Sequence, residues 1–277
     1  MTLKNAVFTF SLATIVTLLS TQALAHRVWV KPNTTVVSGD EAWVTFDAAI
    51  ANGIFNPDHF AYPLERLNAQ GPDGTSVSLE NSATLKYRSV FDLHLQQEGT
   101  YRVYNASHSL MAFWKDEEGN RQMWPGRGKT GTREALLKSV PMDADDLNII
   151  DMSRRLETYV TLGAPSDVTQ DKDNKGLSLS FKGHPNDLYT SEPNQFSFFF
   201  DNERAEGVEI TLVREGQQYR DTDNSQTFRS DKNGNVDITF EDPGMYWLEA
   251  EYSDKKAKAP ANERRGSYVV VLEVLPL

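Results

Sequence analysis

The sequence has 277 residues, with 28 basic and 39 acidic side chains, a formal net charge of −11, and no cysteine. This negative balance argues against nucleic acid and anionic lipid surfaces as partners. The absence of cysteine excludes disulfides, thiolate ligands and thiol chemistry. Any metal site therefore has to use histidine, carboxylate, backbone or amino-terminal groups.

The first 25 residues have the pattern of a cleaved signal peptide. Lys4 supplies positive charge, an apolar stretch covers residues 6–19, and Ala23-Leu24-Ala25 provides the small-x-small cleavage pattern. The apolar stretch is too short to span a bilayer comfortably. We therefore expect export to the periplasm and a mature chain that starts at His26, with no membrane span. Removal of Lys4 changes the balance to 27 − 39 = −12.

The mature chain is predicted to be all-β, with two Ig-like β-sandwich domains. The first domain is expected over residues 26–165, where residues 42–46 and 90–95 alternate between apolar and polar side chains as half-buried strands do. A loop and short-helix insertion is expected over residues 115–156. Its helix is predicted from Thr132, a suitable N-cap, to Lys138.

A polar linker between Gly163 and Gly176 is the expected domain boundary, and the second Ig-like domain is predicted over residues 176–277. Strands are expected at residues 195–200, 208–213 and 268–274. Turn sequences separate these strands, as short strands with regular turns do in sandwiches.

Two stretches share one pattern, in which an alternating strand and an acidic turn lead to Gly-x-Tyr-x-apolar. They are residues 90–103 and 236–248, which contain Gly99-Thr-Tyr101 and Gly244-Met-Tyr246. In Ig-like sandwiches a tyrosine at this place can anchor a corner of the chain. The repeat favours two domains of similar construction.

Two further motifs are interpreted as turns and loops. Gly126-x-Gly128-x-x-Gly131 has the spelling of a dinucleotide fingerprint, but such a site requires a βαβ unit, whereas here Trp124-Pro125 precedes the motif and the chain is expected in a compartment poor in nucleotides. Asp231 opens a stretch that resembles a calcium loop, yet Gly234 stands at its fourth position rather than the sixth. We interpret the first as a flexible basic loop and the second as a hairpin turn.

The histidines are the candidate metal ligands. After cleavage, the α-amine and Nδ1 of His26 can close a chelate ring on one ion, and imidazole suits zinc, copper, iron and nickel. The expected ion is a divalent transition metal: nickel, cobalt, copper or zinc. His59 follows Asp58, whose carboxylate could orient the ring, and is the first candidate for a further ligand. His108 and His184 are weaker candidates, and His94 is expected to be a solvated side chain on a polar strand face.

The chain resembles the NikM-like periplasmic family, which is associated with nickel and cobalt uptake and is otherwise a family of unknown function. The resemblance lies in residues 25–32, with His26 and Trp29, in residues 155–163, and in a second-half set. That set comprises residues 184–189, 207–214 and 244–250. The resemblance implies a β-rich periplasmic protein tied to transition-metal uptake, with His26 as a ligand and His184 as a motif residue.

Three hypotheses follow. The first is a non-enzymatic protein that binds a divalent transition metal and delivers it to an inner-membrane metal transporter. The second is a metal-free β-sandwich scaffold or adhesion module of the cell envelope. The third is a copper oxidase with a terminal-histidine brace, which requires a second histidine near His26 and a flat aromatic face. No carboxylate pair or nucleophile motif assigns a reaction, so the first hypothesis is preferred.

Overall fold

The computed structural model describes residues 26–126, 128–168 and 175–277, and the predicted signal peptide lies outside these residues. Three β-sheets make up the fold, which confirms the all-β prediction. The described part contains one α-helix, α1 (Arg133–Ser139), and two short 3-10 helices, η1 (Leu64–Arg66) and η2 (Gln217–Tyr219). None of its helices has the length and apolar character needed to cross a membrane.

Sheet A has the strand order β1-β3-β8-β7, with β4 beside β3. Its strands are β1 (Arg27–Pro32), β3 (Ala42–Ala51), β4 (Phe60–Ala61), β7 (Glu80–Thr84) and β8 (Ser89–Leu95). Alternation along β8 follows the predicted period of two, because Phe91, Leu93 and Leu95 are buried while Asp92 and His94 lie on the outer face.

Sheet B is the central sheet, with the order β16-β15-β18-β19-β11-β9-β5-β6, β10 beside β9 and β2 beside β11. Its first-half strands are β2 (Val36–Val37), β5 (Asn68–Gln70), β6 (Ser76–Val77), β9 (Gly99–Lys115), β10 (Arg121–Trp124) and β11 (Asn148–Leu162). Its second-half strands are β15 (Glu209–Arg214), β16 (Gln226–Arg229), β18 (Gly244–Asp254) and β19 (Glu263–Val274).

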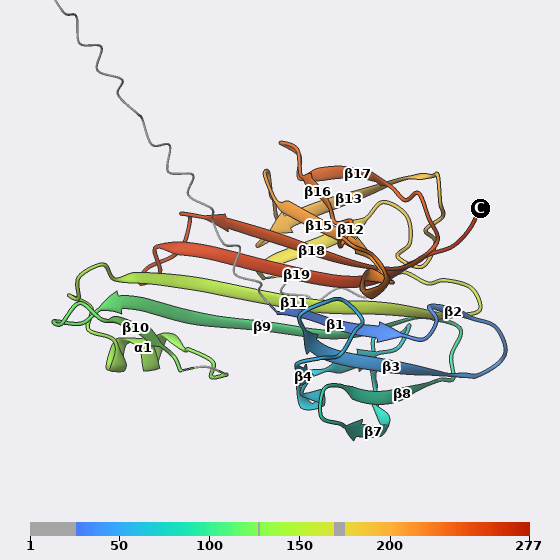
Figure 1. Cartoon of the computed structure of the whole chain (residues 1–277), viewed down its shortest axis with the longest axis horizontal. Helices are drawn as coiled ribbons and strands as arrows, with labels where there is room; N and C mark the ends of the chain where they lie inside the picture. The colour runs from blue at the N-terminus through green and yellow to red at the C-terminus, as the bar shows by residue number, and fades with distance from the viewer. Residues whose placement is uncertain (1–25, 127, 169–174) are drawn as a thin grey trace, which may run out of the picture.

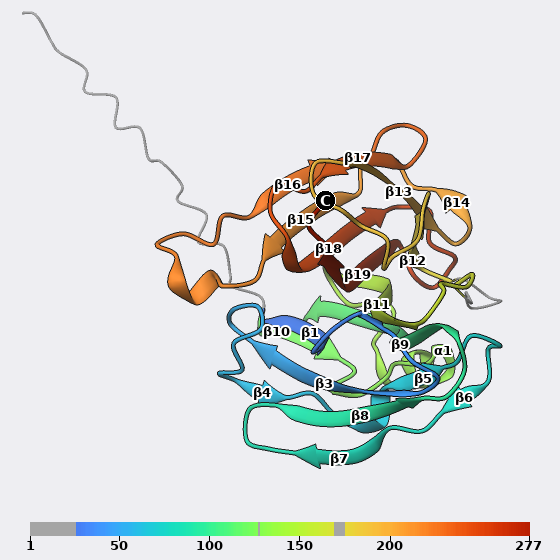
Figure 2. The same ribbon diagram turned by 90° about the vertical axis from the view of Figure 1, so that its right-hand side faces the viewer.

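Sheet C consists of β12 (Leu177–Phe181), β13 (Pro193–Phe200), β14 (Glu203–Arg204) and β17 (Asn235–Thr239). Figure 2 shows sheet A on one side of the central strands and sheet C on the other. The alternation along β19 produces this arrangement: Val269 and Val271 pack into the core under sheet A, whereas Val270 and Leu272 pack into the core under sheet C. A strand buried on both faces explains why residues 268–272 are continuously apolar.

The two halves of the chain share sheet B. Strand β11 of the first half pairs in parallel with β19 of the second, from Ile150↔Glu263 to Thr158↔Val271. The predicted boundary between Gly163 and Gly176 falls partly on residues 169–174, which lie outside the described residues. The division into two domains stays a prediction. Because the two halves share sheet B, a test of it has to ask whether they remain associated after cleavage of the linker.

The insertion lies at the far end of the two longest strands, β9 and β11, as Figure 1 shows. Thr132 caps α1 as predicted, because its side chain accepts a hydrogen bond from the amide of Ala135 at 3.2 Å. The irregular part is shorter than expected, since β9 continues to Lys115 and β11 already begins at Asn148. Leu136 and Ile149 belong to a small separate core at this end.

Both predicted tyrosine corners form. The Tyr101 hydroxyl donates to the carbonyl of Gln97 at 3.0 Å, and the Tyr246 hydroxyl donates to the carbonyl of Asp242 at 2.8 Å. Gly99 and Gly244 precede them with φ of 131° and 133°, a conformation that favours glycine. The repeated motif therefore marks the same local structure in each half.

Candidate metal centre

The structure brings His26 and His59 together. His26 immediately precedes β1, and its ring stacks on that of His59 with 3.8 Å between centroids and 12° between planes. His26 is exposed, and His59 is half-buried. The ring of Phe60 packs edge-on against the ring of His59, with 4.1 Å between their centroids. Of the predicted ligands, these two are therefore neighbours although they are far apart in the sequence.

Asp58 does not orient His59 in the way expected from the sequence. Its carboxylate accepts hydrogen bonds from the backbone amide of Asn52 at 2.9 Å and from the side-chain amide at 3.1 Å. The backbone hydrogen bond from Asn52 lowers the pKa of Asp58 most, and the side-chain hydrogen bond acts in the same direction. Asp58 thus closes the loop that carries His59 and leaves the imidazole nitrogens without a carboxylate partner.

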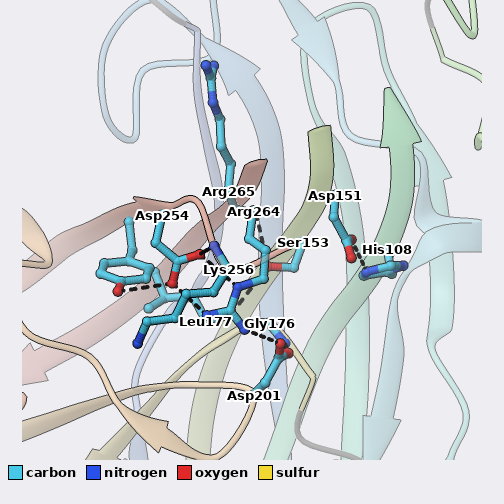
Figure 3. Close-up of polar contacts among 11 residues, drawn as sticks. His108, Asp151, Ser153, Gly176, Leu177, Asp201, Asp254, Lys256, Arg264 and Arg265 are labelled. Atoms are coloured by element: carbon cyan, nitrogen blue, oxygen red, sulfur yellow. Dashed lines mark hydrogen bonds and ion pairs between the residues drawn. The ribbon is translucent and has the colours of Figure 1, made fainter. Parts of the chain in front are cut away.

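His108 lies elsewhere, on β9, where it forms an ion pair with Asp151 of β11. Figure 3 shows this pair beside a second cluster, in which Arg264 contacts Asp201 at 2.6 Å and Asp254 at 2.5 Å. The hydrogen bond that the His108 ring donates to the Asp151 carboxylate raises the pKa of His108 above its usual value. The His108 ring is therefore already engaged by the Asp151 carboxylate, and a metal ion would have to compete with this contact.

His184 is engaged at both ring nitrogens. Nδ1 accepts a hydrogen bond from the amide of Asn186 at 3.1 Å, while Nε2 lies 2.9 Å from Thr100 Oγ1 and 3.2 Å from the carbonyl of Ser166. Burial lowers the pKa of the ring. A metal ion could reach neither nitrogen without breaking these contacts, so we place only His26 and His59 in the candidate centre.

Within the described residues, no group of three or more histidine or carboxylate side chains is arranged to hold an ion. The candidate centre consequently depends on a donor that is not a side chain, the α-amine that cleavage before His26 would free. The three nitrogens would then be this amine, Nδ1 of His26 and one ring nitrogen of His59. Such a set fits nickel, cobalt, copper or zinc, which all accept nitrogen ligands.

Two polar features of the structure were not predicted from the sequence. His94 is not simply solvated: its ring stacks on the half-exposed Trp43 at 4.2 Å, and Nε2 lies 3.1 Å from a Glu41 carboxylate oxygen. Cross-strand register brings Trp43 and His94 opposite each other. Only the pairing of β3 with β8 reveals this contact, because the two residues lie far apart in the sequence.

The second feature is the buried carboxylate of Glu157 on β11. It accepts hydrogen bonds from the Tyr268 hydroxyl at 2.8 Å and from the Tyr159 hydroxyl, and it pairs with Arg102 and Arg155. Burial raises the pKa of Glu157, but the two guanidinium groups outweigh burial and hold the pKa below its usual value. The network ties together β9, β11 and β19 at the centre of sheet B, so we assign it a structural role.

Fold and site together define a β-sandwich protein with two stacked histidines, of which His26 precedes the first strand and His59 precedes β4. Comparison with protein families places residues 23–254 in the family described as "Domain of unknown function (DUF4198)". The chain belongs to this family. The description names no metal, so the nickel and cobalt association remains part of the resemblance alone.

Comparison with curated proteins gives no match. Among solved structures, the chain is similar to the D0-D1 domain of intimin, with 9% identity over 88% of this chain and 96% of that chain, at a TM-score of 0.21. It is also similar to red sea bream transglutaminase, with 11% identity over 91% of this chain and 31% of that chain, at a TM-score of 0.19. TM-scores this low carry no argument about function.

Proposed function

We propose that the chain is a non-enzymatic periplasmic protein that binds a divalent transition metal ion through His26 and His59 after removal of residues 1–25. The stacking of these two rings at 3.8 Å is the observation that supports the proposal. Two imidazoles this close need only ring rotation to direct one nitrogen each toward a common ion. The proposed role is capture of the ion and its delivery to an inner-membrane metal transporter.

The free amine is the decisive element. It has a reference pKa of about 7.7–8.0 and imidazole one of about 6.5, so both lose a proton when they bind metal. Binding should therefore release protons and weaken steeply below about pH 6. The residue after the amine-bearing His26 is held by the sheet, because β1 pairs with β3 from Arg27↔Ala51 onward.

The test compares five forms of the mature protein by calorimetric titration with nickel, cobalt, copper and zinc. These are the authentic form, a form with one extra residue before His26, and the variants His26→Ala, His59→Ala and His94→Ala. We expect the extended form and the first two variants to lose at least tenfold in affinity. His94→Ala, whose ring contacts Trp43 and Glu41 instead, is the matched control.

Equal affinity in the authentic and extended forms would show that the amine takes no part. Full affinity in His59→Ala would remove the second ring from the site. If the authentic form binds none of the four metals, the proposal is wrong, and the metal-free scaffold or adhesion module becomes the preferred function.

The third hypothesis, a copper oxidase with a terminal-histidine brace, gains one of its two requirements, since His59 is the second histidine near His26. Four tryptophans could supply the flat aromatic face. Trp29 is 1% exposed, and His94 covers one side of the exposed Trp43. Trp114 and Trp124 pack against the small core at the insertion. We therefore retain metal binding without a reaction.

A further inference from the structure

A cleft of about 730 Å³ opens on the face of sheet B that faces sheet A, beyond the point where sheet A ends. On β18, Met245 and Trp247 are buried under sheet A, and the next side chains on the same face, Glu249 and Glu251, line the cleft. Val28 of β1 and His26, which precedes that strand, also line the cleft. The cleft therefore begins where the first strand begins.

Charged side chains cross the floor of this cleft in one cross-strand row. Strand register places Arg229 opposite Glu209, Glu209 opposite Glu251, Glu251 opposite Ser267, and Ser267 opposite Arg154. Side chains directly opposite one another share a face of the sheet. The row thus has two carboxylates in its middle and one guanidinium group at each end.

None of these four charged side chains makes a hydrogen bond or an ion pair with another described residue. Like charges directly opposite each other, such as Glu209 and Glu251, oppose sheet formation. Arg264, by contrast, contacts both Asp254 and Asp201. What distinguishes the row is that its unpaired charges of both signs line one cleft.

Glu249 adds a half-buried carboxylate beside the row. Burial, followed by repulsion from Glu251, raises its pKa to about 7. Arg27 is the cation that opposes this effect, but its guanidinium group is also 3.0 Å from Asp223 and lies over the ring of Trp247. A positive group bound between Glu249 and Glu251 would relieve this repulsion.

We propose that this cleft binds a small zwitterion of the α-amino-acid or short-peptide type. Its ammonium group would lie at Glu249 and Glu251, and its carboxylate would lie at Arg154. Adjacent strands are about 4.8 Å apart, so Glu251 and Arg154, two strands apart, leave a gap of roughly 10 Å between their backbones. The hydroxyl of Ser267 lies between them and can contact either group of the ligand.

A zwitterion fits better than a simple cation or anion because each end of the site repels the wrong charge. A diamine would place its second ammonium group near Arg154, and a dicarboxylate would place one carboxylate near Glu249. Arg265 lines the cleft as well, but its guanidinium group already contacts the Glu263 carboxylate at 2.5 Å. The inference goes beyond the proposed metal binding, and although His26 lies beside the cleft, none of the proposed contacts with the zwitterion uses it.

The test is calorimetric titration of the mature protein, in the presence of a metal chelator, with the free α-amino acids and a glycyl-glycine dipeptide. Ethylamine and propionate are the single-charge probes. We expect at least one zwitterion to bind at least tenfold more tightly than either probe. Glu251→Gln and Arg154→Gln should each weaken that binding about tenfold, as expected for the loss of one charge-assisted hydrogen bond.

Glu80→Gln and Arg121→Gln are matched controls, because both residues are exposed and lie on strands outside the cleft. They should bind the zwitterion as the unmodified protein does. No binding by any zwitterion overturns the inference, as does equal binding of ethylamine, or full affinity in Glu251→Gln and Arg154→Gln. Since the chelator removes metal, failure here leaves the metal proposal standing, and failure of metal binding leaves this one standing.

Discussion

The ring of His184 is held in one neutral tautomer by its neighbours. Because the amide of Asn186 donates to Nδ1, the ring proton resides on Nε2, where it can be donated to the carbonyl of Ser166. Protonation would place a second proton at Nδ1 against an amide donor. This geometry explains, together with burial, why the pKa of His184 is lowered.

The lowered pKa predicts a loss of stability in acid. Below pH 6.5 the unfolded chain binds a proton at His184 that the folded protein refuses, so the free energy of unfolding decreases as pH falls through this range. His108 acts in the opposite sense: its pKa is raised by Asp151, so its contribution is present below pH 6.5 and is lost as pH rises through the folded pKa.

We expect His184→Gln to lower the free energy of unfolding by about 1–3 kcal/mol at pH 7, because partners of the ring lose their hydrogen bonds. The variant should also show a weaker loss of stability between pH 7 and pH 5. Denaturant unfolding at several pH values measures both effects, and nuclear magnetic resonance should find His184 titrating below His108. The reverse order of the two titrations would contradict this account.

At this scale the sequence predicted part of the site. His26 and His59 were selected by a cleavage pattern and a loop context, and the structure places them in contact. His184 could not be judged in advance, since its partners Thr100 and Ser166 come from distant segments. The row in the cleft was equally hidden, because Glu251 and Arg154 become neighbours only through the pairing of three strands.

At the scale of elements, the two tyrosine corners look alike in sequence but differ in their hydrogen bonds. The Tyr101 hydroxyl accepts from the amides of Gln96 at 3.0 Å and Gln97 at 2.8 Å, in addition to its own donation to a carbonyl. The Tyr246 hydroxyl makes a single bond, to the carbonyl of Asp242. Tyr101 therefore fixes the turn between β8 and β9 more firmly than Tyr246 fixes its own turn.

We predict that Tyr101→Phe lowers the free energy of unfolding by about 1–3 kcal/mol, because two backbone amides lose their acceptor. Tyr246→Phe should cost about 0.5–1.5 kcal/mol, the net value of one ordinary hydrogen bond. Urea denaturation of the two variants under the same conditions provides the comparison. A larger loss in Tyr246→Phe would show that the extra bonds of Tyr101 do not stabilise the corner.

The elements themselves were largely readable from the sequence, because alternation and turn residues are local signals. Strands at residues 42–46, 90–95 and 195–200 lie within β3, β8 and β13. The extent of β11 could not be predicted from the sequence. Residues 148–156 were assigned to the insertion, but they form the first part of this strand. Their burial depends on β9 and β19 on either side, and such distant pairing leaves no local pattern.

At the scale of the whole molecule, sheet B controls how the two halves separate. The parallel pairing of β11 with β19 crosses the predicted domain boundary, and both cores use side chains from both halves. Val213 and Trp247 of the second half belong to the core under sheet A. Separating the halves would therefore expose part of each core.

We predict that limited proteolysis between Gly163 and Gly176 leaves the two fragments associated in native buffer. They should elute as one species of unchanged size and dissociate only in denaturant, because cleavage there breaks none of the β11–β19 pairing. Size-exclusion chromatography of the cleaved protein gives the answer. Two folded fragments that elute separately would instead confirm independent domains.

The same connectivity determines at what stage of folding the N-terminal segment can complete its contacts. The carbonyl of Val28 receives the indole N–H of Trp247 at 2.9 Å, and the amide and hydroxyl of Thr35 both donate to Glu273, at 2.8 and 2.6 Å. Trp247 and Glu273 are synthesised more than two hundred residues after Val28 and Thr35, with which they form these hydrogen bonds. Long-range contacts of this kind slow folding, because the intervening chain has to be ordered first. For a chain exported as proposed above, the histidine end emerges into the periplasm first and is completed last, only after nearly all of the chain has followed it.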